Sequence, residues 1–367
     1  MARLLIKGVY MADRQTYHEQ QDIRNILRLR ELLKELPPFA KDYFRAIDTT
    51  TSTRTRISYA YDMQVFFRFL VSENPVYKDY SPTDFKVEDL DRINARDIEE
   101  YLEYLKVYEA DEDKKAGTSV YTNGERGLKR KMSSLRGFYG YYFRQEMIKT
   151  NPTVLVDMPK VHEKAITRLD ADEVALLLDH IENAGASLSG QAAAYFEKTK
   201  ERDLALITLL LGTGIRVSEC VGLDLEDLDF KNGAIKVVRK GGNEAVVYFG
   251  DEVEKALLNY LEVREGMVTA PGHEHALFLS TQRKRINVRS VENLVKKYVT
   301  PVTTTKHITP HKLRSTYGTA LYRETGDIYL VADVLGHKDV NTTRRHYAAM
   351  DDDKKRRAAG AVRLRED

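Results

Sequence analysis

Six side chains in the second half of the sequence have chemistry suited to a phosphodiester. They are two arginines, two histidines, one lysine and one tyrosine: Arg216, Arg314, His311, His337, Lys240 and Tyr347. A guanidinium group does not ligate metals, but it binds phosphate oxygens through paired hydrogen bonds. A cationic site of this kind also needs a nucleophile and a proton donor. Tyr347 can supply the first, and Lys240, in a Gly-rich turn, can protonate the leaving oxygen.

The local sequence places these side chains where such a site needs them. His311 and Arg314 lie three residues apart on a predicted helix that starts at Pro310, so both face the same side. The Gly212-Thr213-Gly214 break ends one predicted helix and puts Arg216 at the start of the next. Each residue alone has an ordinary structural explanation, and the protein has 22 tyrosines. The conjunction of these four residue types in a fixed order favours a catalytic site.

The sequence gives no support for a nucleotide hydrolase, a dinucleotide-dependent redox enzyme, a disulfide-linked protein or a membrane protein. It contains no GxxxxGK[ST] phosphate loop and no GxGxxG, HExxH or GxSxG motif. Cys220 is the one cysteine, which excludes a disulfide framework and a Cys-rich zinc site and fits a reducing compartment. No stretch approaches the roughly 18 apolar residues of a membrane span. The sequence predicts a soluble, cytoplasmic protein with no metal and no cofactor.

These motifs together resemble the tyrosine recombinase (phage integrase) family, in a form similar to Xer-type recombinases and mobile-element integrases. The resemblance extends from about Pro38 to Tyr347. The segment GIRVSE resembles the first arginine motif of the family, with Glu219 as an acidic supporting residue. The segment HKLR, with His311 and Arg314, resembles the H-x-x-R box of the family. The segment LGH resembles the next histidine position, with His337, and Lys240 in the hairpin resembles the catalytic lysine. Tyr347 lies ten residues after His337, whereas in many members of the family the nucleophilic tyrosine lies nine residues after this histidine.

The resemblance implies strand cleavage through a covalent 3′-phosphotyrosine, with release of a 5′-hydroxyl and without ATP or metal. It implies that the protein binds double-stranded DNA at a specific recombination site and encloses the duplex in a C-shaped clamp. It also implies a synaptic tetramer linked in trans by the C-terminal tail, with an accessory or paired recombinase as a further partner. The process that the resemblance implies is chromosome dimer resolution or mobile-element integration and excision. A type IB topoisomerase-like enzyme and a non-catalytic architectural DNA-binding protein stay open as alternatives.

The charged residues are distributed in blocks, although Lys and Arg (58) nearly balance Asp and Glu (56). Residues 81–113 carry a net charge of −8, whereas residues 121–150 carry +5 and residues 281–320 carry +8. Two basic blocks suit a polyanion, because phosphate contacts supply much of the affinity for DNA. The predicted DNA-binding residues are Lys129, Arg130, Lys131, Arg136, Arg283, Lys284, Arg285 and Arg289.

Apolar periodicity predicts a mainly α protein. We expect an N-terminal bundle of four or five helices that clamps DNA. An α+β catalytic domain should follow, with a small antiparallel hairpin around Gly241-Gly242-Asn243. The predicted domains are an N-terminal helical extension (1–37), a core-binding, SAM-like helical domain (38–155) and a catalytic domain with a C-terminal tail (156–367). We further predict a linker at 151–167, a loop at 109–118 and a strand at 276–280.

Overall fold

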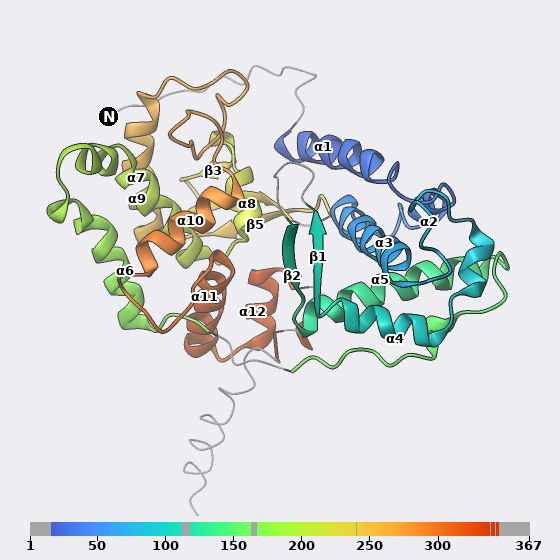
Figure 1. Ribbon diagram of the computed structural model, residues 1–367. Helices are drawn as coiled ribbons and strands as arrows, with labels where there is room; N and C mark the ends of the chain where they lie inside the picture. Colours follow the sequence, from blue (N-terminus) through green and yellow to red (C-terminus); the bar gives the residue numbers. More distant parts are fainter. Residues whose placement is uncertain are drawn as a thin grey trace, which may run out of the picture. The chain divides into compact units, whose positions relative to one another are not determined.

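The computed structural model describes residues 16–111, 118–162, 167–239, 241–337, 339–341 and 343–344. The chain divides into two compact units, Met1–Lys164 and Ala165–Asp367 (Figure 1). Helices dominate both units, and the strands form small antiparallel sheets, which confirms the predicted fold class. Within the described ranges, no helix is long and apolar enough to cross a membrane.

The first unit is a helical bundle with one β-hairpin. Its elements are α1 (Tyr17–Leu32), α2 (Ala40–Ala46), α3 (Thr53–Glu73), a 3-10 turn (Val87–Arg92), α4 (Ala95–Tyr104), β1 (Val107–Asp111), β2 (Thr118–Thr122), α5 (Glu125–Arg144) and a 3-10 turn (Pro152–Val154). Ser52 begins α3 and Asn94 begins α4, because their side-chain oxygens accept backbone N–H groups of the first turn.

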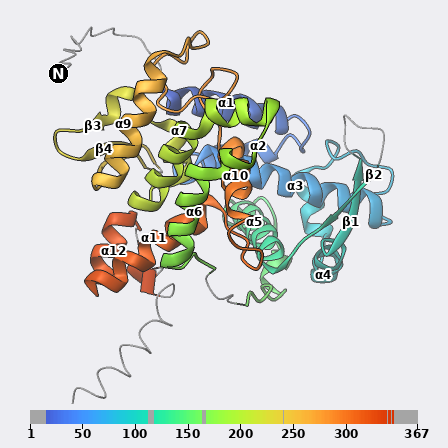
Figure 2. The same ribbon diagram turned by 90° about the vertical axis from the view of Figure 1, so that its left-hand side faces the viewer.

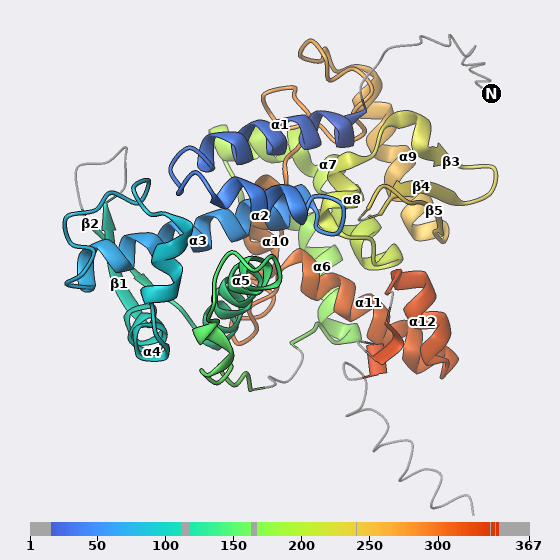
Figure 3. The same ribbon diagram turned by 90° about the vertical axis from the view of Figure 1, so that its right-hand side faces the viewer.

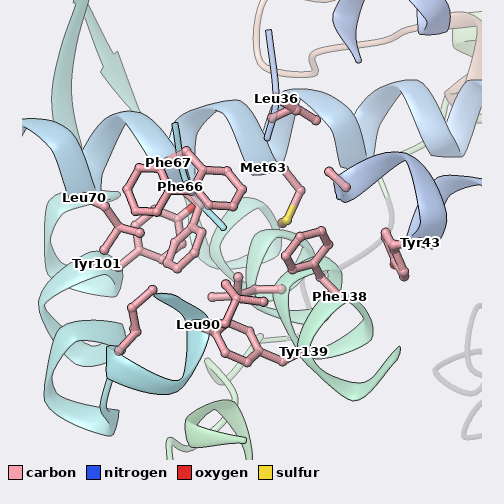
Figure 4. Packing of buried hydrophobic residues seen from close by; sticks show 14 of the residues in the cluster. Leu36, Tyr43, Met63, Phe66, Phe67, Leu70, Leu90, Tyr101, Phe138 and Tyr139 are labelled. Carbon is pink, nitrogen blue, oxygen red and sulfur yellow. The ribbon is translucent and has the colours of Figure 1, made fainter. Parts of the chain in front are cut away.

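The core of the first unit is rich in aromatic rings (Figure 4). Phe66 of α3 packs edge to face on Tyr101 of α4 at 5.1 Å between ring centroids, and both are fully buried. Helix α1 runs beside α3 (Figure 3) and buries Leu29 and Leu32 in the same core. The described part of the predicted extension, residues 16–37, is therefore built into the bundle.

The predicted loop at 109–118 is wrong over its described residues, because β1 and β2 pair there as an antiparallel hairpin. Tyr108 lies opposite Tyr121, and their rings stack at 5.5 Å. Tyr108 also stacks on Tyr104 of α4 at 5.2 Å. The hairpin forms because this pairing covers aromatic surface that a loop would leave in water.

The boundary between the units falls nine residues beyond the predicted 155/156, inside the predicted linker. Arg136 of α5 holds the start of that linker to the first unit. Its Nε donates to the carbonyl oxygen of Thr153 at 3.0 Å, and its Nη2 donates to that of Val156 at 2.5 Å. Val156 itself is buried in the first core.

The second unit packs helices around the long α7 and a small sheet. Its elements are α6 (Ala171–Asn183), a 3-10 turn (Ala184–Ser187), α7 (Gly190–Thr213), α8 (Val217–Gly222), a 3-10 turn (Leu225–Asp227), β3 (Leu228–Asp229), β4 (Ala234–Val238), β5 (Glu244–Tyr248), α9 (Asp251–Glu265), α10 (Val288–Val299), α11 (Pro310–Thr325) and α12 (Ile328–Leu335). Helix α9 lies against α7 (Figure 2).

The sheet of the second unit has the antiparallel order β3-β4-β5, so the hairpin predicted around Gly241-Gly242-Asn243 is confirmed. The strand predicted at 276–280 is wrong. Those described residues form only isolated bridges, Asp224 with Ala276 and Leu279 with Arg285. The segment is apolar because Leu277 and Phe278 are buried, with the ring of Phe278 stacked on Tyr260 of α9, and not because it belongs to a sheet.

Candidate active site

Arg216 occupies the junction between α7 and α8. Helix α7 ends at Gly214, whose φ of 62° lies in the left-handed region. A Cβ at this position would lie 2.4 Å from a ring carbon of Tyr317, so both the turn and its packing require glycine. The backbone N–H of Arg216 donates to Glu219 at 2.8 Å, and its Nη1 donates to the other carboxylate oxygen at 2.7 Å. Glu219 is buried, so it fixes the direction of a guanidinium that stays one-third exposed.

Arg314 and His311 come from the start of α11, the helix predicted to begin at Pro310. Arg314 is buried and donates through Nη1 to the carbonyl oxygen of Gly214 at 2.6 Å. Its Nη2 donates to the carbonyl oxygen of Leu335. His311 lies one turn earlier and is exposed. Arg314 therefore joins the end of α7 to the end of α12, while His311 faces solvent.

The end of α12 brings His337 to the two arginines. Gly336 ends the helix with a φ of 60°, and its carbonyl oxygen accepts a hydrogen bond from Arg216 Nη2 at 3.2 Å. The next residue, His337, closes the turn by donating its backbone N–H to Ala332 at 2.8 Å. The Nδ1 atom of its ring is hydrogen-bonded to Oγ1 of the buried Thr343 at 2.7 Å.

Three of the six predicted residues thus meet at one turn. Arg216 and Arg314 hold the neighbouring carbonyls of Leu335 and Gly336, directly before His337. The terminal carbonyls of a helix carry partial negative charge, which orients guanidinium groups before a ligand arrives. A pair of arginines held in this way can clamp the oxygens of a phosphodiester and stabilise the charge that develops on it.

Two of the predicted catalytic residues, Lys240 and Tyr347, lie outside the described residues. Their flanks are described: β4 and β5 on either side of the hairpin turn, and residues 343–344 before the tyrosine. Among the described residues, no group of three or more His, Cys, Asp and Glu side chains could hold a metal ion.

The basic residues predicted on α5 divide into two kinds. Lys129 is exposed. Arg130 and Lys131, in contrast, both pair with the carboxylate of Asp62, whose side chain is 1% exposed. Arg136 donates to the carbonyls described above. Three of these four cations therefore support the fold of the first unit, and of these Arg130 is still 44% exposed.

The basic residues predicted in the second unit divide in the same way. Arg285 donates to the carbonyl oxygen of Leu223 at 2.7 Å and pairs with Asp224. Arg289 is exposed and pairs with Glu292 at 3.2 Å, one turn further along α10. The charges that face solvent from the adjoining turn are Arg283 and Lys284.

Sequence reasoning missed two residues that matter at these places. Asp62 is an acid within an otherwise apolar stretch of α3, and that misfit was the available signal for a buried charge. Arg239 immediately precedes Lys240, and its side chain reaches the end of α12, where its Nη2 donates to the carbonyl oxygen of Val334 at 3.1 Å. No local pattern in the sequence indicates that contact.

The sequence of the second unit matches a known family model. The model of the phage integrase family matches residues 167–354, a range that includes every residue of the candidate site. The chain belongs to the phage integrase family. Tyrosine recombinase XerC of Caldanaerobacter subterraneus subsp. tengcongensis is 32% identical over 334 residues, which are 88% of this chain and 85% of that protein. Tyrosine recombinase XerS of Lactococcus lactis subsp. cremoris is 31% identical over 351 residues, which are 88% of this chain and 94% of that protein.

A solved structure shares the fold of this phage integrase family member. XerH site-specific recombinase bound to a palindromic difH substrate, in a post-cleavage complex, aligns with a TM-score of 0.64. The alignment covers 95% of this chain and 90% of that chain at 19% sequence identity. The protein is a tyrosine recombinase of Xer or integrase type, and hence a site-specific DNA recombinase.

Proposed function

We propose that the protein cuts and rejoins DNA through a transient covalent link to Tyr347. The observation that carries the proposal is the convergence of Arg216 and Arg314 on the turn before His337. The two guanidinium groups at this turn provide a cationic binding site for one phosphodiester. Tyr347 follows ten residues after His337 in the sequence.

In the proposed reaction, the phenol of Tyr347 releases its proton to solvent, its oxygen attacks the phosphorus, and the bond to the 5′-oxygen breaks. Lys240 donates a proton to that leaving oxygen, so the products are a 3′-phosphotyrosine and a free 5′-hydroxyl. Arg216 and Arg314 stabilise the charge on the non-bridging oxygens, with His311 and His337 as additional donors. The phosphotyrosine ester keeps the energy of the broken bond. A 5′-hydroxyl from the same or a partner duplex can therefore attack it without ATP.

We further propose that both units contact one duplex and that four copies assemble on two recombination sites. Lys129 in the first unit and Arg283 and Lys284 in the second are the proposed phosphate contacts. Residues 354–367 would dock on a neighbouring copy. Deleting them should impair synapsis and strand exchange more than DNA binding, and equal loss of all three would refute the docking role. The substrate is chromosomal or mobile-element DNA, so the proposed compartment is the cytoplasm.

The test begins with DNA trapped on the protein. Cells expressing the wild-type chain or Tyr347→Phe are lysed in denaturant, and DNA that remains covalently attached is sequenced. We expect one recurrent site with the wild type and none with Tyr347→Phe. A duplex carrying that site then separates strand exchange from relaxation. Relaxation of supercoiled DNA by the monomer without strand exchange would favour the alternative, a type IB topoisomerase-like enzyme, and DNA binding without any adduct would favour an architectural protein.

A further inference from the structure

Arg239 is held in the hairpin turn between β4 and β5, one residue before Lys240. Its backbone N–H donates to the carbonyl oxygen of Asn243 at 2.7 Å, and its carbonyl oxygen accepts from Gly242 at 3.1 Å. The turn is thus closed around Arg239 by two main-chain hydrogen bonds. Any contact of the Arg239 side chain with the rest of the unit fixes the position of this turn.

The side chain of Arg239 makes such a contact with the end of α12. Its Nη2 donates to the carbonyl oxygen of Val334 at 3.1 Å, and its Nη1 lies 3.4 Å from that of Asp333. The space for the guanidinium exists because residue 336 is glycine. A Cβ there would lie 2.2 Å from Nη1 of Arg239 and 2.5 Å from its Cζ.

The same turn holds the two arginines of the candidate site. Four successive carbonyls, those of residues 333–336, are occupied by three guanidinium groups, from Arg239, Arg314 and Arg216. Carbonyls at the end of a helix carry its negative partial charge, so they favour cations. Two of the three arginines form the phosphate clamp, and the third connects that clamp to the hairpin.

We propose that Arg239 is a positioning residue, which ties the turn that continues into Lys240 to the end of α12, at the phosphate clamp. This inference rests on the proposed function, because it requires Lys240 to give its proton to the 5′-oxygen as the phosphorus–oxygen bond breaks. Both Nη atoms of Arg239 face main-chain oxygens, so Arg239 acts on the reaction through the turn and not through the phosphate.

The test changes the leaving atom. In one duplex the scissile phosphate carries its normal 5′-oxygen, and in the other a 5′-bridging sulfur replaces it. A thiolate, whose conjugate acid has a pKa of about 8.5, leaves without help from a proton donor. Arg239→Ala should slow single-turnover cleavage of the oxygen duplex by about 100-fold, the scale expected for a displaced proton donor. On the sulfur duplex it should cleave within about threefold of the wild type.

Two further variants sharpen the comparison. Lys240→Ala should show the same pattern as Arg239→Ala, and Arg239→Lys should be intermediate, because an ammonium cannot span two carbonyls. Lys236→Ala is the matched control. It removes a cation from β4 of the same hairpin, and Lys236 pairs across the sheet with the exposed Glu244. We expect this control to cleave both duplexes at the wild-type rate.

The sulfur duplex also reports the fraction of folded, active protein, so a misfolded variant is recognised by slow cleavage of both substrates together with loss of DNA binding. Equal slowing of both substrates by Arg239→Ala with DNA binding intact would place Arg239 in the clamp and overturn the inference. Wild-type cleavage of the oxygen duplex, or a defect confined to DNA affinity, would overturn it too. Failure of the proposed function is distinct, because the wild type itself would then form no adduct.

Discussion

Lys131→Met should destabilise the first unit while leaving the phosphate contacts of α5 intact. Lys131 is 9% exposed and lies 3.3 Å from a carboxylate oxygen of Asp62, which is almost completely buried. Removing one partner of a buried ion pair costs about 3–5 kcal/mol. Arg130 still pairs with Asp62 and is 44% exposed, so we expect a loss near the lower end, about 3 kcal/mol, in the free energy of unfolding.

The matched control is Lys129→Met on the same helix. Lys129 is exposed, so its replacement should change the free energy of unfolding by less than about 0.5 kcal/mol. It should also reduce the slope of log affinity against log salt by about 0.9 for a duplex of arbitrary sequence, the value for one lost phosphate contact. Urea unfolding and salt titrations measure the two quantities. The reasoning fails if Lys131→Met is as stable as the wild type, or if it changes the salt slope as Lys129→Met does.

The same variant has a defined pH dependence. Burial raises the pKa of Asp62, and Lys131 opposes this rise, so Lys131→Met raises that pKa further. A carboxyl whose pKa is higher in the folded than in the unfolded protein binds more protons when folded. Its contribution to stability therefore increases as the pH falls through the folded pKa. The stability deficit of Lys131→Met relative to the wild type should shrink as the pH is lowered from neutral, and a constant deficit would contradict the role of Asp62.

Three other experiments test the candidate site and the packing around it. Glu219→Gln keeps an acceptor for the backbone N–H of Arg216 but removes the ion pair. It should lower single-turnover cleavage by about tenfold with DNA affinity unchanged, and a selective loss of affinity would count against it. Gly214→Ala should lower the free energy of unfolding by about 2–3 kcal/mol in urea, because its φ is 62° and the new Cβ meets Tyr317. Burial raises the pKa of the Cys220 thiol, so iodoacetamide should modify it only after unfolding; rapid labelling of the native protein would refute that burial.

The sequence predicted the elements whose signals are local. The helix predicted to start at Pro310 is α11, and the predicted Gly241-Gly242-Asn243 turn joins two paired strands. The β1–β2 hairpin escaped prediction because the acidic strand β1 pairs with β2 through Tyr108 and Tyr121, whose ring stacking depends on three-dimensional contact.

The residue types of the candidate site could be predicted from the sequence, but the hydrogen bonds and ion pairs that hold its basic residues could not. The spacing of His311 and Arg314 follows from one helix turn, and the glycine break before Arg216 marks a helix start. The roles of Arg130 and Lys131 could not be inferred, because their partner Asp62 lies more than sixty residues away in the chain. A basic run on a helix has the same sequence whether its cations meet DNA or a buried carboxylate.

The most direct test of the account is to locate the covalent bond between protein and DNA. The wild-type chain is trapped on a nicked duplex that carries its recombination site, digested with protease and nuclease, and analysed by tandem mass spectrometry. The account predicts one modified residue, Tyr347, joined to a 3′-phosphate, together with a free 5′-hydroxyl on the released strand. A link at another residue, or a tyrosine joined to a 5′-phosphate, would contradict it.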